Sequence, residues 1–86
     1  MSFTVVLPRS VQKQLARIDE LITTRIEAAL LDLQKNPRPA GSKKLKSRDG
    51  WRIRIGDYRV IYEIHDRILQ IIVIQIGHRR EVYRNT

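Results

Sequence analysis

The run Ile68–Ile76 restricts the fold of this chain more than any other segment, because it is apolar on both faces of the strand that it would form. A strand with one face in water alternates between apolar and polar residues, so this run predicts a central strand. Two shorter β-branched runs precede it, at 51–55 and 58–64. Turns at Gly56-Asp57 and near His65-Asp66-Arg67 would join the three runs into an antiparallel meander. A brief last strand is expected at 81–83.

The first half of the chain predicts a short strand followed by two helices. Residues 3–7 read as the strand, and Pro8 suits the first turn of a helix that extends to Ile18. Asp19-Glu20 fit the start of a second helix, which the prolines after Asn36 would end. We therefore expect one α+β domain over residues 1–86, in the order βααβββ with a possible final strand. Its antiparallel sheet would pack against the N-terminal two-helix hairpin.

Positive charge is concentrated in the second half of the chain. Seventeen Lys and Arg against nine Asp and Glu give a net charge of +8, and residues 43–86 hold eleven of the bases and five of the acids. Such a field favours a polyanionic partner. A merely soluble basic surface or an acidic protein partner would explain the charge equally well. The N-terminus has no basic segment before a long apolar run, so we expect a cytoplasmic protein without a membrane partner.

The pattern of the basic residues indicates RNA. In a strand over residues 51–55, Arg52 and Arg54 would project from one face, while Trp51, Ile53 and Ile55 would project from the other. Guanidinium groups pair with phosphates, and tyrosine rings such as those in the next strand can stack on bases. A sheet that presents arginines beside tyrosines is therefore suited to binding nucleic acid, and RNA is the better candidate.

Several catalytic classes do not fit the residues. The chain has no Cys, its two His residues lie thirteen positions apart, and no Gly-rich phosphate loop precedes a helix. We expect no metal and no cofactor. If the chain cleaves RNA, the route that remains is metal-free, with the 2′-OH attacking the neighbouring phosphate. That route needs a proton acceptor, cations for the growing negative charge, and a donor or cation for the leaving oxygen.

Three motifs in the expected order resemble the RelE family of toxin–antitoxin ribonucleases. They are the Lys44-Leu45-Lys46 segment, the stretch from Gly56 to Tyr62, and the stretch from Gly77 to Tyr83. The resemblance covers nearly the whole chain. It implies a type II toxin that enters the ribosomal A site, cleaves mRNA there without a metal ion, and so inhibits translation.

The resemblance also implies roles for three arginines of the meander. Arg52 and Arg54 stand where the best-known family member has two lysines, one of which contacts the scissile phosphate while the other acts as general base. A guanidinium keeps its proton, so it stabilises the transition state well but is a poor base. Arg59 matches an arginine that binds the scissile phosphate. An ion pair with Glu63 on the same strand face is the alternative for Arg59.

The C-terminal motif supplies the remaining catalytic candidates. By resemblance, Arg79 stabilises the transition state and the leaving oxygen, although Arg80 could take that role. Tyr83 would stack on a base or orient the 2′-OH, with a core-packing role as the alternative. His78 replaces a lysine of the family, and an imidazole exchanges protons near neutral pH. We therefore hypothesise that His78 transfers a proton in the reaction, with Arg54 or a lysine as other candidates for the base.

The remaining basic residues suit docking on RNA or on the ribosome rather than chemistry, and they are Lys43, Lys44, Lys46, Arg48 and Arg80. The resemblance further implies a cognate antitoxin of the RelB type with an acidic toxin-binding segment, and a toxin–antitoxin complex that binds its own operator DNA through the antitoxin. Two other functions stay open. One is a toxin of the ParE group, which acts on DNA gyrase without nuclease activity, and the other is a plain RNA-binding module.

Overall fold

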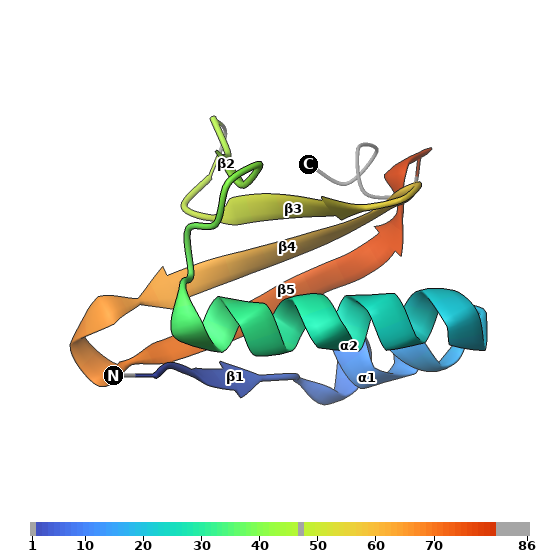
Figure 1. The fold of residues 1–86 in the computed structure, drawn as a ribbon, viewed down its shortest axis with the longest axis horizontal. Coiled ribbons are helices and arrows are strands. Elements are labelled where there is room, and N and C mark those ends of the chain that lie inside the picture. The colour runs from blue at the N-terminus through green and yellow to red at the C-terminus, as the bar shows by residue number, and fades with distance from the viewer. Residues whose placement is uncertain (1, 47, 81–86) are drawn as a thin grey trace.

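A computed structural model describes residues 2–46 and 48–80 of the chain (Figure 1). It has an α+β fold in which both helices lie on one face of a single sheet, as predicted. The predicted strand at 81–83 lies outside the described residues. In chain order the elements are β1 (Thr4–Val6), α1 (Arg9–Ala16), α2 (Glu20–Lys35), β2 (Lys43–Lys44), β3 (Trp51–Ile55), β4 (Tyr58–His65), the 3-10 helix η1 (Asp66–Ile68) and β5 (Gln70–His78).

The sheet is mixed, although a wholly antiparallel sheet was expected. Its strand order is β1-β5-β4-β3-β2, and β1 pairs with β5 in parallel, with Val5 opposite Ile71. The other three pairs are antiparallel, as the short turns between them require. Two helices separate β1 from the meander, so no hairpin turn sets the direction of β1. β5 lies between β1 and β4, which confirms it as a central strand.

Local signals start both helices and end α2 where they were expected, while α1 ends at Ala16 and so before Ile18. Pro8 is the N-cap of α1, and the Asp19 side chain caps α2 by accepting a 3.1 Å hydrogen bond from the backbone N–H of Leu21. α2 ends before Asn36, whose backbone is extended because the following Pro37 disfavours the helical conformation. Neither helix is long and apolar enough to cross a membrane.

The core lies between the two helices and one face of the sheet. Helix α1 contributes Val11, which is fully buried, and α2 contributes three buried residues at helical spacing. The core residues of β3 and β4 come from alternate positions, as the strand pattern predicted, while Arg59 and Ile61 are buried on the other face of β4. Besides Val11, the buried core consists of Ile26, Leu30, Leu33, Ile53, Ile55, Val60, Tyr62, Ile71, Val73 and Ile76.

A β-bulge interrupts the pairing of β4 with β5 and changes which residues of β5 face the core. Ile61 pairs with Gln75 and the next residue, Tyr62, pairs with Val73, so Ile74 is the extra residue on β5. Before the bulge, Ile71 and Val73 are buried in the core. After it, Ile76 is buried in the core, although strict alternation would have turned it to the other face. After the bulge, the residues of β5 therefore face the side opposite to the one that alternation along the sequence predicts.

Candidate functional site

Three of the predicted arginines lie on the sheet face that the helices leave uncovered, and we call Arg52, Arg54 and Arg59 the arginine face. Arg54 pairs directly with Arg59 across β3 and β4. The residues before and after Arg54, Ile53 and Ile55, are both buried in the core on the opposite face. This confirms the predicted projection of Arg52 and Arg54. Gly56 has a φ of 59° in the two-residue turn that sets this register, a conformation that favours glycine.

The three arginines of this face differ in how accessible they are. Arg54 is exposed and Arg52 is partly buried. Arg59 is only 1% exposed, and its Nη1 donates hydrogen bonds to the carbonyl oxygens of Tyr58 at 3.1 Å and Gly56 at 3.4 Å. The alternative partner of Arg59, the carboxylate of Glu63, pairs instead with His65. A phosphate could reach Arg59 only after its surroundings open, whereas Arg54 is accessible in this structure.

A basic cavity of about 340 Å³ lies beside the arginine face. Lys43 pairs with Arg52 across β2 and β3, and its side chain lines this cavity together with those of Arg52 and Arg54. The other described lining residues, Ala40, Gly41 and Ile53, carry no charge. The structure thus brings a predicted docking lysine next to two predicted catalytic arginines. The absence of a carboxylate among these lining residues suits the cavity for an anion.

His78 does not share a face with the three arginines. It pairs with Tyr58 across β4 and β5, the two rings meet edge to face at 5.7 Å, and Tyr58 packs against the core on the helix side. The bulge in β5 causes this placement. His78 Nδ1 accepts a 3.4 Å hydrogen bond from the backbone N–H of Arg80, so Nε2 carries the ring hydrogen. As a proton acceptor, His78 would have to turn its ring or release this bond.

The other C-terminal candidates are only partly described. Arg79 and Arg80 are exposed, and the backbone N–H of Arg79 donates a 2.8 Å hydrogen bond to the Asp57 carbonyl, which ties the end of β5 to the β3–β4 turn. Arg79 therefore begins at the same end of the sheet as Arg54. Tyr83 lies outside the described residues.

Four of the predicted docking residues lie on the β2 side of the molecule, and the fifth, Arg80, follows β5. Lys44 pairs with Trp51 and faces away from Lys43, while Lys46 and Arg48 are exposed in the following loop. The loop is anchored where the backbone N–H of Leu45 donates a 3.0 Å hydrogen bond to the carbonyl of Gly50. Of these residues, only Lys43 adjoins the arginine face through a shared cavity.

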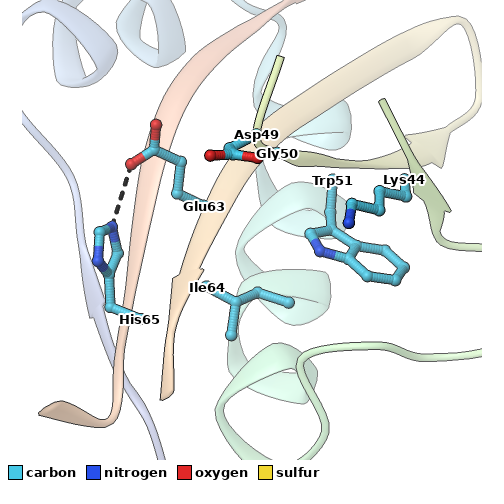
Figure 2. A pocket seen from close by; sticks show the side chains of 7 residues that line it. All are labelled: Lys44, Asp49, Gly50, Trp51, Glu63, Ile64 and His65. Atoms are coloured by element: carbon cyan, nitrogen blue, oxygen red, sulfur yellow. Dashed lines mark hydrogen bonds and ion pairs between the residues drawn. The ribbon is translucent and has the colours of Figure 1, made fainter. Parts of the chain in front are cut away.

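A different group of side chains surrounds a pocket of about 370 Å³ at the far end of β4 (Figure 2). Glu63 Oε1 lies 3.0 Å from His65 Nε2, and Asp49, Lys44 and Trp51 line the same pocket. Two carboxylates and one lysine make this end less basic than the arginine face. Among residues 2–46 and 48–80, no group of three or more His, Cys, Asp or Glu side chains could hold a metal ion.

Tyr62 is a structural residue of the core and not a surface on which a base could stack. It is fully buried, and its hydroxyl donates a 2.8 Å hydrogen bond to the carbonyl of Pro37. Burial raises the pKa of Tyr62 to about 12, so the phenol stays protonated at neutral pH and cannot accept a proton there.

The sequence patterns did not identify the residues that accompany His78. Arg17 at the C-cap of α1 and Gln14 within α1 line one pocket with Tyr58 and His78. Gln14 Oε1 accepts a 2.8 Å hydrogen bond from the backbone N–H of Ile76, which joins α1 to β5. Only the docking of α1 on β5 brings these residues together, and no sequence motif marks it.

Comparison with known proteins identifies one family model, described as the ParE toxin of type II toxin–antitoxin systems, parDE, which matches residues 5–83. A curated relative, Toxin RelG of Mycobacterium tuberculosis, is 26% identical over 86 residues, which cover 98% of this chain and 99% of the relative. The family model therefore spans nearly the whole domain, including the arginine face and the C-terminal motif.

Solved structures show the same fold. The RelE–RelB complex of the archaeon Pyrococcus horikoshii includes a chain that matches with a TM-score of 0.82 and 27% identity, over 92% of this chain and 97% of that one. The toxin–antitoxin complex RelBE2 of Mycobacterium tuberculosis includes a chain that matches with a TM-score of 0.81 and 22% identity, over 92% of this chain and 100% of that one. The second likeness shows the fold alone.

Proposed function

The chain belongs to the ParE toxin family of type II toxin–antitoxin systems, within the RelE/ParE superfamily, and on this premise we propose that it is an endoribonuclease that cleaves mRNA in the ribosomal A site. The observation that carries the proposal is the arginine face beside the Lys43 cavity, whose described lining residues include three cations and no carboxylate. Cations grouped on the sheet face opposite the helices suit a substrate that gains negative charge at phosphorus.

The proposed reaction is attack by the 2′-OH on the adjacent phosphorus. The new bond joins the 2′-oxygen to phosphorus, the bond from phosphorus to the 5′-oxygen breaks, and the products carry a 2′,3′-cyclic phosphate and a 5′-hydroxyl. Arg52 and Arg54 neutralise the charge on the non-bridging oxygens, and Arg59 joins them when its surroundings open. Arg79, or Arg80 beside it, neutralises the leaving 5′-oxygen.

The proton steps have fewer candidates, because the side chains of the arginine face keep their protons. His78 is the proposed proton-transfer group, and it lies at the same end of the sheet as Arg54 but on the opposite face. For His78 to act, the RNA has to bend round the β3–β4 turn. The proposed role of Tyr83 is to stack on the base beside the cut. The proposed cleavage step is thus carried by cationic side chains and by one proton-transfer group of the chain.

The proposed dependence on the ribosome has a physical reason, because the site has few groups that can act as an acid or a base. A site that mainly supplies positive charge gains most from a substrate that is held in line for attack, and such positioning is worth several kcal/mol of barrier. The exposed Lys44, Lys46 and Arg48 are proposed to dock on ribosomal RNA phosphates through salt-sensitive contacts.

We propose that a cognate antitoxin holds the toxin inactive, because the relatives of known structure include toxins crystallised with their antitoxins. The net charge of +8 favours an acidic toxin-binding segment that covers the arginine face. The proposed complex binds its operator DNA through the antitoxin.

The family description itself favours a second candidate, a ParE-like toxin that inhibits DNA gyrase without cutting RNA. Primer extension on translated mRNA, with DNA integrity measured in the same cells, separates the two. We expect cuts at A-site codons and intact DNA. Broken DNA with intact mRNA would instead support the gyrase inhibitor. Arg79→Ala should abolish the cuts while ribosome binding persists, whereas a plain RNA-binding module would give no cuts even in the unaltered protein.

A further inference from the structure

A second polar pocket lies round the end of the sheet from the arginine face, and we propose that it is an RNA phosphate subsite formed by Arg17, Tyr58 and His78. Its function would be to hold the RNA backbone where the RNA leaves the arginine face. The inference rests on the proposed function, because it extends the path of the same RNA substrate. The pocket has a volume of about 430 Å³ and lies between the C-terminal end of α1 and the paired ends of β4 and β5.

The walls of this pocket are held in place by contacts on two sides. Gln14 Oε1 accepts the 2.8 Å hydrogen bond from Ile76 and so fixes α1 against β5. The rings of Tyr58 and His78 support each other edge to face, with planes at 79°. The pocket is thus built by three elements that are distant in sequence.

The polar groups in this pocket are hydrogen-bond donors of the kind that bind phosphate. The Arg17 guanidinium is exposed and makes no hydrogen bond or ion pair with the described residues, so it is available to a ligand. His78 presents Nε2–H, because its Nδ1 accepts from Arg80, and the Tyr58 hydroxyl can also donate. No Asp or Glu is among the described lining residues. This donor set suits an anion and has no group that would repel one.

The position of the pocket identifies which anion it would bind. Tyr58 and Arg59 are consecutive residues of β4, so their side chains point to opposite faces of the sheet at the same strand end. A single RNA strand that passes Arg54 and bends round the Gly56-Asp57 turn would reach both surfaces. The ring edges of Tyr58 and His78 also offer contact to a ribose or a base, which inorganic phosphate could not use.

The test is a titration of the full isotope-labelled chain with a short 2′-O-methyl RNA, which cannot be cut by 2′-OH attack, and separately with inorganic phosphate. NMR signals of the Tyr58 and His78 rings and of Arg17 Nε report on the pocket, and fluorescence anisotropy gives the dissociation constant. Arg17→Gln is compared with Arg9→Gln, which removes the same charge from an exposed position of the same helix.

We expect the RNA to shift all three signals, and inorganic phosphate to shift them only at much higher concentration. Arg17→Gln should weaken RNA binding roughly fivefold, and the slope of log binding constant against log salt concentration should become shallower by about one. Arg9→Gln should change the affinity less than about twofold. If both variants weakened binding equally, the loss of net charge alone would explain the effect, and the proposed subsite would be disproved. The subsite would also be disproved if RNA did not shift the ring signals of Tyr58 and His78, or if only an acidic antitoxin peptide shifted them.

The same measurements separate this inference from the proposed function. If the unaltered toxin does not cut mRNA on ribosomes but Arg17→Gln still weakens RNA binding selectively, the nuclease proposal fails and the subsite stands. If mRNA is cut at A-site codons and Arg17→Gln binds RNA like Arg9→Gln, the nuclease proposal stands and the subsite fails.

Discussion

The two ends of β4 differ in charge and in the kind of ligand that they suit. At the first end, the polar side chains near Arg59 are arginines, a tyrosine, a histidine and the exposed Asp57 of the turn, and neither adjoining cavity has a described acidic lining residue. At the last end, Glu63 and Asp49 share a pocket with Lys44 and His65 (Figure 2). The net charge of +8 is therefore not spread evenly along the sheet. Function is expected at the first end, and the last end provides matched controls for it.

The largest expected effect is on catalysis at the first end. Arg54→Ala removes the exposed cation of the arginine face, and we expect the rate of mRNA cleavage on programmed ribosomes to fall roughly 10²-fold, as when a transition-state charge contact is lost. The matched control is Arg67→Ala in the exposed η1 segment beyond the last end of β4, which should leave the rate within about twofold. Equal losses in both variants would remove the distinction between the two ends.

The two histidines allow the same comparison for proton transfer. His78→Gln should lower the cleavage rate roughly tenfold or more and flatten its dependence on pH between about pH 6 and about pH 9. His65→Gln makes the same change at the other end, where the imidazole pairs with Glu63, and should have no such effect. Single-turnover rates across this range test the prediction. An undiminished rate in His78→Gln would exclude His78 from the reaction.

Much of the first end was predictable, because simple periodicities govern it. The β-branched alternation of β3 placed Arg52 and Arg54 on one face, and the Gly56-Asp57 turn set the pairing of Arg54 with Arg59. The motif from Gly77 to Tyr83 indicated which basic residues to consider. These features are local, so the sequence contains the information that determines them.

The remaining features depend on contacts between distant segments. The bulge at Ile74 moves His78 to the helix side, and no turn residue marks it in the sequence. The parallel direction of β1 depends on how the helices return the chain. The burial of Arg59 and the bond between Gln14 and Ile76 also arise only when the elements pack together. Alternation therefore identified the arginines but not the partners of His78.

A smaller effect is expected on stability, from the tyrosine that lies between the two ends. Tyr62→Phe leaves the carbonyl of Pro37 without its hydrogen bond, so the free energy of unfolding should fall by about 1–2 kcal/mol. Tyr58→Phe is the control, because the hydroxyl of the partly buried Tyr58 makes no hydrogen bond with the described residues. Urea denaturation of the two variants should show that only Tyr62→Phe is clearly less stable than the unaltered protein.

Tyr62 also predicts a dependence of stability on pH. Burial raises its pKa from 10.0 to about 12, so the folded state keeps a proton that the unfolded state loses first. The contribution is complete below about pH 10 and is lost as the pH rises towards 12, by roughly 3 kcal/mol in total. The difference between the unaltered protein and Tyr62→Phe should show this loss. A difference that stays constant up to pH 12 would contradict the raised pKa.

The smallest effect is expected at the last end of β4. Glu63→Gln breaks a partly exposed pair with His65, so the free energy of unfolding should change by less than about 0.5 kcal/mol. The variant also removes one negative charge from the sheet face that carries the arginines, and affinity for a short 2′-O-methyl RNA should rise by no more than about twofold, because solvent and salt screen an exposed charge. Anisotropy titrations at low and high salt measure this change. A gain of tenfold or more would mean that RNA runs along the whole of β4 and reaches the carboxylate end, so the substrate path would not be confined to the first end.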